Sequence, residues 1–158
     1  MKTPDKQERH MAKILLVDDE EDMVELLAFN LQEQGHSIIT AGAGLEALDK
    51  ARALVPDLIL LDLMLPDLDG ISICELLRRQ PATRGIPIIM ITALGGEIAR
   101  LAAFDSGVND YMRKPFSPRE LVKQVGDLLR GYESKIQSKE TEQHKSSGKG
   151  SGGGQRQP

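Results

Sequence analysis

The chain lacks several residue types that mark particular classes of protein. It has no tryptophan, its aromatic residues make up 3% of the sequence, and it has a single cysteine, Cys74. One cysteine excludes an internal disulfide framework and fits a reducing compartment, and we expect Cys74 to be a small apolar filler. The first residues contain no apolar segment typical of a secretory signal, and no apolar run approaches the ~20 residues of a membrane-spanning helix. These absences predict a cytoplasmic protein with no membrane partner.

The charge balance is mildly acidic, with 24 Asp and Glu against 20 Lys and Arg and a formal net charge of −4. This balance argues against direct nucleic-acid binding, which favours basic surfaces. Hydrophobic residues make up 40% of the 158 residues, which suffices for one globular domain. Residues 1–11 and the Gly-, Ser- and Lys-rich residues 136–158 carry no apolar periodicity. We expect both ends to be disordered and residues 12–135 to form the domain.

Short apolar segments alternate with amphipathic segments along the middle of the chain. The apolar segments predict strands at 13–18, 36–41, 57–62, 86–92 and 108–114. The amphipathic segments predict helices at 20–35, 45–54, 70–80, 97–107 and 117–135. This alternation is typical of a doubly wound α/β fold, in which helices cover both faces of a parallel sheet. Ligands of such folds bind at the carboxyl ends of the strands.

Polar residues with matching chemistry end or follow four of the predicted strands. They are Asp18 and Asp19, Asp62, Thr92, and Lys114 followed by Pro115. Taken singly, each has a structural explanation, since an Asp can cap the next helix and a Lys can be solvated. Together, three carboxylates at one edge repel unless a cation is present, and their oxygens suit a hard ion such as Mg²⁺, or Mn²⁺ in its place. A lysine and a hydroxyl at the same edge can bind phosphoryl oxygens, which indicates phosphoryl transfer onto an aspartate.

Four segments resemble the receiver domain of two-component response regulators, including the chemotaxis-type regulators. The segments are ILLVDDE, DLILLDLMLPDLDG, IMITA and DYMRKPF. The resemblance extends over about residues 12–133 and all five strand–helix units. It implies a flavodoxin-like (βα)5 fold whose five-stranded parallel sheet has the order 2-1-3-4-5. It also implies that the chain is a phosphoacceptor with self-phosphorylation and self-dephosphorylation chemistry, and not an enzyme.

The same resemblance implies the roles of the acidic residues. Asp62 would be the phosphoacceptor, taking the phosphoryl group from the phosphohistidine of a sensor histidine kinase or a phosphotransfer protein. Asp19 and Asp62 would bind Mg²⁺ directly, and Asp18 would bind it through water. The backbone carbonyl of Met64 would be the remaining protein ligand of the metal.

The resemblance also implies how the phosphoryl group is held and sensed. Thr92 would donate a hydrogen bond to a phosphoryl oxygen, and Lys114 would form an ion pair with the phosphoryl group. The bond between Lys114 and Pro115 would be a cis peptide. Tyr111 would be the aromatic switch residue, which in relatives turns inward as the threonine moves toward the phosphate. The signal would pass to a downstream protein through the surface of the fourth helix, fifth strand and fifth helix.

In relatives with DNA-binding domains that surface often forms a dimer through charged pairs. Arg100, Asp110 and Glu120 fall where such partners are expected, but Gln124 and Gly126 stand where relatives often have basic residues. We therefore expect a dimer through this face to be weak or absent, which gel filtration with a phosphoryl mimic can test.

Other classes of protein fit the motifs less well. A flavodoxin-type electron carrier needs a hydroxyl-rich phosphate loop, whereas VDDEED would repel the phosphate of FMN. A phosphatase of the haloacid dehalogenase type needs two acids separated by one residue, whereas Asp18 and Asp19 are adjacent. The open alternative concerns output: the chain is either a stand-alone receiver acting by protein contacts, which we favour, or the amino-terminal receiver of a DNA-binding transcriptional regulator.

Overall fold

The computed structural model describes residues 11–131 of the chain. The disorder predicted for the two ends therefore falls, apart from Met11, on residues outside this range. The strands are β1 (Lys13–Val17), β2 (Ser37–Ala41), β3 (Leu58–Asp62), β4 (Ile88–Thr92) and β5 (Asp110–Arg113). The helices are α1 (Glu21–Glu33), α2 (Gly44–Leu54), α3 (Gly70–Arg79), α4 (Glu97–Ser106) and a last helix whose described part covers 118–131. None of the helices in this described part is long and apolar enough to cross a membrane.

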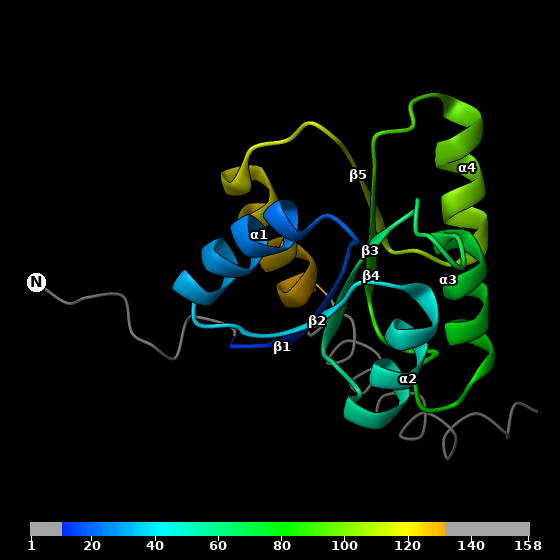
Figure 1. Ribbon diagram of the computed structural model, residues 1–158, viewed down its shortest axis with the longest axis horizontal. Helices are drawn as coiled ribbons and strands as arrows, with labels where there is room; N and C mark the ends of the chain where they lie inside the picture. The colour runs from blue at the N-terminus through cyan, green and yellow to red at the C-terminus, as the bar shows by residue number, and fades with distance from the viewer. Residues whose placement is uncertain (1–10, 132–158) are drawn as a thin grey trace, which may run out of the picture.

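The strands form one parallel sheet with the order β2-β1-β3-β4-β5, which confirms the predicted fold. Helix α1 and the last helix cover one face of this sheet, and α2, α3 and α4 cover the other (Figure 1). The central strand β3 is buried at every position. A strand covered on both faces has to be apolar almost throughout, which explains the unbroken apolar run before Asp62.

Alternate strand residues point to opposite faces and form two separate cores. The core beneath α2, α3 and α4 contains Leu15, Val17, Ile59 and Leu61. The core beneath α1 and the last helix contains Ile14, Leu16, Leu58 and Leu60. Cys74 of α3 lies fully buried in the first core, where its Sγ is 3.2 Å from the Ser106 carbonyl oxygen. Burial raises the pKa of this thiol, so Cys74 is a core filler and not a reactive group.

The predicted ends of the elements within the described range lie within two residues of the observed ends. The largest relative difference is in the last strand, which is predicted at 108–114 and observed as the shorter β5. Gly107, with a φ of 109°, ends α4 in the left-handed conformation and directs the chain into a turn. Asn109 lies in this turn and donates its N–H to the Ile88 carbonyl oxygen at 2.8 Å. Val108, an apolar residue within this turn, extended the sequence pattern beyond the true strand.

The carboxyl end of β3 is packed closely against the start of α3. A Cβ on Gly70 would lie 2.7 Å from the Asp62 carbonyl oxygen and 2.9 Å from the Leu63 Cα, so only glycine allows this approach. The Gly70 N–H donates to the Leu63 carbonyl oxygen at 2.8 Å and closes the loop. This loop returns the chain to the sheet immediately after Asp62.

Candidate functional site

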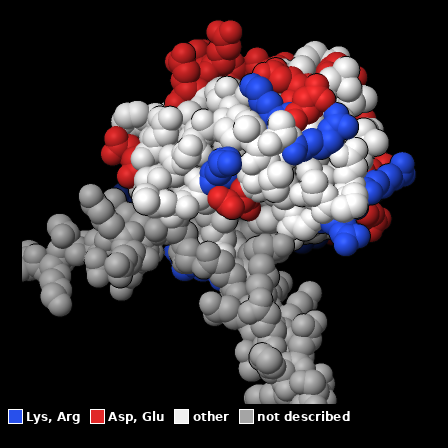
Figure 2. Space-filling model, turned by 90° about the horizontal axis from the view of Figure 1, so that it is seen from below, with Lys and Arg blue, Asp and Glu red and all other residues white. Residues whose placement is uncertain are grey.

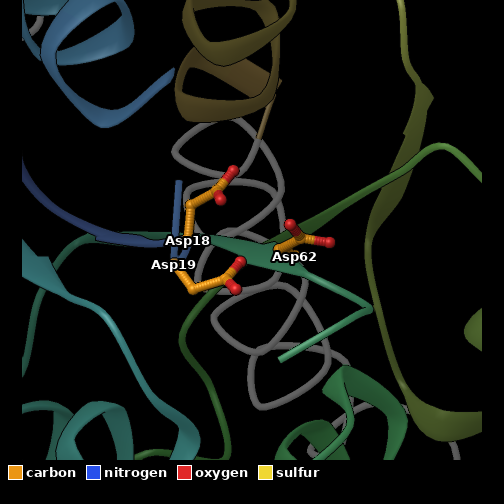
Figure 3. Close-up of side chains that lie close together, drawn as sticks. All are labelled: Asp18, Asp19 and Asp62. Carbon is orange, nitrogen blue, oxygen red and sulfur yellow. The ribbon is translucent and has the colours of Figure 1, made fainter. Parts of the chain in front are cut away.

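Three aspartates meet at the carboxyl edge of the sheet. Asp18 and Asp19 follow β1, and Asp62 is the last residue of the adjacent strand β3. One carboxylate oxygen from each lies within 4.8 Å of the others, and the three side chains face a common space (Figure 3). Asp18 and Asp62 are buried, whereas Asp19 is exposed. The sheet order brings together residues that are separated by more than forty positions in the sequence.

Lys114 reaches this cluster from the far side of β4. Its Nζ lies 3.2 Å from an oxygen of Asp18 and 3.2 Å from an oxygen of Asp62, and its side chain is 13% exposed. Burial by itself lowers the pKa of Lys114, but the charges of the two carboxylates outweigh burial and hold the pKa above its ordinary value. The lysine is therefore a fixed positive charge at the site. The peptide bond to Pro115 that follows is cis.

The environment of Asp62 opposes its negative charge. Burial raises the pKa of Asp62 above its ordinary value, and the charge of Asp18 acts in the same direction. The Met64 N–H, 3.0 Å from Oδ1, and the charge of Lys114 act in the opposite direction without cancelling the rise. Asp62 thus carries a charge that the protein alone compensates incompletely.

Thr92 and Tyr111 lie on the side of the site formed by β4 and β5. Thr92 ends β4 and is fully buried, and its Oγ1 accepts the Leu94 N–H at 3.0 Å. The Tyr111 hydroxyl donates to the Leu94 carbonyl oxygen at 2.9 Å. Threonine and tyrosine are therefore both bonded to the same residue of the β4–α4 loop. A movement of this loop must change both contacts.

The donor set of the site fits a hard divalent cation. Three carboxylates converge, and among the described residues Lys114 is the only cation within ion-pair distance of them. Exclusively oxygen ligands select Mg²⁺, Mn²⁺ or Ca²⁺ over softer metals. The site can therefore bind such an ion, and without one its net negative charge would repel a phosphate.

Two residues outside this set were not predicted from the sequence. Asp67 of the β3–α3 loop accepts N–H groups at the start of α2. Arg78 of α3 donates to carbonyl groups in the turn before β4 and in the turn before β5. The only sequence signal for the role of Asp67 is indirect. Ala43, at the N-cap of α2, has no side chain that can cap the helix, so the acceptor has to come from elsewhere in the chain. Arg78 carries no such signal.

The fold and the site define a flavodoxin-like doubly wound domain with an acidic centre at its strand ends. A model of the response regulator receiver domain matches residues 14–126, which is most of the chain. The chain belongs to this family, as its motifs suggested.

Curated relatives are regulators of transcription. The chain is 49% identical over 128 residues to the alkaline phosphatase synthesis transcriptional regulatory protein PhoP of Bacillus subtilis, covering 81% of this chain and 52% of PhoP. It is 42% identical over 120 residues to the DNA-binding dual master transcriptional regulator RpaA of Synechocystis, covering 76% of this chain and 50% of RpaA. The chain spans about half the length of these relatives.

Solved structures show the same fold. A two-component response regulator from Clostridium difficile is 34% identical, with a TM-score of 0.72 over 76% of this chain and 97% of that chain. A CheY-like receiver domain protein from Methanospirillum hungatei is 26% identical, with a TM-score of 0.74 over 79% of this chain and 98% of that chain. In both cases the match covers nearly the whole of the solved chain.

Proposed function

We propose that this receiver domain accepts a phosphoryl group on Asp62 from the phosphohistidine of a sensor histidine kinase or a phosphotransfer protein. The observation that carries the proposal is the position of Asp62 at the carboxyl edge of the sheet, where it meets Asp18 and Asp19 and lies 3.2 Å from the Lys114 Nζ. The proposed cofactor is Mg²⁺, for which Mn²⁺ can substitute. Because the group is accepted once and not turned over on a separate substrate, the domain is a phosphoacceptor and not an enzyme.

Four residues would hold the cation. Asp19 and Asp62 would bind it directly, Asp18 would bind it through water, and the Met64 backbone carbonyl would complete the protein ligands. The exposed position of Asp19 and the buried positions of Asp18 and Asp62 leave one side open to solvent and to a phosphodonor. When bound, the cation supplies charge neutralisation at the phosphoryl oxygens. We propose no other metal site.

In the transfer, an oxygen of Asp62 attacks the phosphorus of the donor. The bond between phosphorus and the imidazole nitrogen breaks, and the imidazole leaves with that electron pair while its other nitrogen keeps its proton. Lys114 balances the charge of the transferred group, and the Thr92 hydroxyl, free to rotate, donates to one of its oxygens. Lys114 is already held beside Asp62 by its ion pairs, whereas Thr92 has to move toward the phosphoryl group.

The phosphoryl group would then act as a switch. Its charge attracts Thr92 and Lys114, and because Thr92 and Tyr111 share Leu94 as a partner, their movement changes the β4–α4 loop. The surface of α4, β5 and the last helix would report this change to a downstream protein in the cytoplasm. On this surface Arg100 pairs with Glu97 and Gln124 donates to the Tyr111 carbonyl, which supports a weak dimer at most.

The first prediction concerns phosphorylation by a small donor. Wild-type protein incubated with acetyl phosphate and Mg²⁺ is expected to gain the mass of one phosphoryl group, and to gain none when EDTA removes the metal. Asp62→Asn is expected to gain none under either condition, because it lacks the attacking carboxylate. The control is Asp57→Asn, at the opposite end of the same strand, where Asp57 accepts the Lys13 N–H. Intact-mass measurement decides, and equal phosphorylation of Asp62→Asn would contradict the proposal.

The second prediction concerns the lifetime of the phosphorylated form. Met64 and Leu94 flank the site and are 59% and 45% exposed, and their apolar side chains cannot orient a water that attacks the phosphorus. We expect slow self-dephosphorylation, over minutes or longer. Mass measurements over time record it as the loss of the phosphorylated species. Met64→Gln is expected to shorten the lifetime about tenfold or more, because an amide can orient water. A wild-type lifetime of seconds, unchanged by this substitution, would show that water reaches the site without help.

The names of the relatives favour a second reading of the output. PhoP and RpaA are named as transcriptional regulators, and this chain spans about half of each. The chain would then be the receiver part of a longer DNA-binding regulator. An immunoblot of the source cells with an antibody raised against residues 12–131 tests this reading. A band of about twice the mass of this chain supports it, and a band at the mass of this chain supports a stand-alone receiver.

A further inference from the structure

The β3–α3 loop, residues 63–69, joins Asp62 to α3 and contains the Met64 carbonyl. The loop is anchored at its two ends, where Leu63 donates to the Ile91 carbonyl oxygen at 3.1 Å and Gly70 donates to the Leu63 carbonyl oxygen at 2.8 Å. Within the part of the chain that the structure describes, two residues of the segment 64–68 are hydrogen-bonded to another element. The Met64 N–H donates to Oδ1 of Asp62 in β3 at 3.0 Å, and Asp67 accepts N–H groups at the start of α2. On the α2 side, the hydrogen bonds of this loop therefore depend on the Asp67 side chain.

The partner of Asp67 is the start of α2. The first N–H groups of a helix have no partner within the helix, and Ala43 at the N-cap provides no side-chain acceptor. The Asp67 carboxylate takes this place from another part of the chain: Oδ1 lies 2.7 Å from the Gly44 nitrogen and Oδ2 lies 2.9 Å from the Leu45 nitrogen. A negative charge is favourable at a helix N-terminus. The N–H groups of Leu45 and Gly44 hold the pKa of this carboxyl below its ordinary value, so it stays ionised.

Gly44 allows the loop to approach α2 this closely. A Cβ at Gly44 would lie 2.7 Å from the Ile73 Cδ1, 2.9 Å from the Leu68 Cβ and 3.2 Å from the Asp67 Oδ1. The Ile73 methyl can move, but the Leu68 Cβ is fixed to the loop backbone. An alanine at Gly44 would therefore displace the loop from the α2 side without changing any charge.

We propose that Asp67 is a positioning residue that ties the β3–α3 loop to the N-terminus of α2 and thereby holds the Met64 carbonyl in place for the divalent cation. The inference rests on the proposed function, since it assumes that the acidic cluster binds this cation. Asp67 itself does not contact the cation or the phosphoryl group. Its role is to fix the part of the loop that follows Met64 and precedes Gly70, so that the loop backbone cannot move away from α2.

The test measures Mg²⁺ affinity directly, by titration of backbone amide NMR shifts at physiological ionic strength and without any phosphodonor. Asp67→Ala is expected to weaken Mg²⁺ binding about tenfold, the size of effect seen when the support of a metal ligand is removed. Asp67→Asn keeps an oxygen acceptor for one of the two α2 N–H groups and is expected to weaken Mg²⁺ binding less than Asp67→Ala does. Gly44→Ala is expected to weaken binding although it changes no charge.

The matched control is Asp57→Ala, which also removes one carboxylate that accepts a backbone N–H, at 2.8 Å from the Lys13 nitrogen, but at the opposite end of β3. It is expected to bind Mg²⁺ as the wild type does. If wild-type protein fails to bind Mg²⁺, the proposed function itself is wrong. If the wild type binds and Asp67→Ala binds equally well, only the role of Asp67 is wrong. If Asp67→Asn loses as much Mg²⁺ affinity as Asp67→Ala, the effect is one of charge and the positioning role is wrong. If Gly44→Ala does not fold, the comparison of the two Asp67 variants decides alone.

Discussion

Replacing Lys114 by methionine is expected to lower the free energy of unfolding by about 2–3 kcal/mol in the absence of Mg²⁺, because two buried carboxylates lose their shared cation. Lys114 lies 3.2 Å from oxygens of both Asp18 and Asp62, whose side chains are 3% and 7% exposed. The same substitution is expected to strengthen Mg²⁺ binding, since a positive charge beside the carboxylates is removed. Phosphorylation by acetyl phosphate is expected to slow about a hundredfold, because the developing charge loses its stabilising partner.

Urea unfolding with and without Mg²⁺ measures the first two effects together. Mg²⁺ should restore more stability to Lys114→Met than it adds to the wild type. The control is Lys50→Met, in which a lysine also loses a carboxylate partner, Glu46, but at an exposed position where ion pairs contribute little. Unchanged metal-free stability, or weaker Mg²⁺ binding in Lys114→Met, would contradict the geometry of the site as we interpret it.

Replacing Arg78 by alanine is expected to lower the free energy of unfolding by about 2–3 kcal/mol, since several charge-assisted hydrogen bonds are lost at once. The Arg78 Nε donates to the Gly107 carbonyl oxygen at 2.9 Å, and Nη1 donates to the Arg84 and Ile86 carbonyl oxygens at 3.0 and 2.7 Å. Nη2 donates to Oδ1 of Asn109 at 2.9 Å. One guanidinium thus joins the turn before β4 to the turn before β5.

Arg79, the next residue, is the matched control, because it is exposed and takes part in none of these contacts. Arg79→Ala is expected to change the stability by less than about 0.5 kcal/mol. Arg78→Lys is expected to recover only part of the loss, since an ammonium cannot reproduce the planar fork. A similar small effect for both alanine variants in urea unfolding would show that the carbonyl groups are solvated as well without Arg78 as with it.

The sequence alone predicts the fold and most of the candidate site for a physical reason. Parallel strands alternate with helices, so all strands end at the same edge, and the polar residues that end them must lie near one another. The unbroken apolar run before Asp62 follows from β3 being central and covered on both faces. The strand order came from the resemblance, and it is this order that places Asp18 and Asp62 on neighbouring strands.

The contacts that sequence reasoning missed join distant segments without a local pattern. Asp67 bonds residues 22 and 23 positions away, and Arg78 bonds residues up to 31 positions away. A carboxylate in a loop and an arginine near the end of a helix are ordinary surface residues in any sequence. Apart from the Asn109 side chain, which bonds Arg78, the partners named above are backbone groups, which carry no sequence signal. Lys114 was predicted from its place at a strand end, but its reach across β4 to two carboxylates became visible only in three dimensions.

The most direct test of the central claim is to locate the phosphoryl group within the chain. After reaction with acetyl phosphate and Mg²⁺, borohydride reduces an aspartyl phosphate to homoserine, which marks the modified residue permanently. Peptide mass mapping is expected to find the homoserine at position 62, in the peptide that contains LILLDLMLPDLDG. Homoserine at another aspartate, such as Asp18 or Asp19, or none in a protein that has gained the phosphoryl mass, would contradict the assignment of Asp62 as the phosphoacceptor.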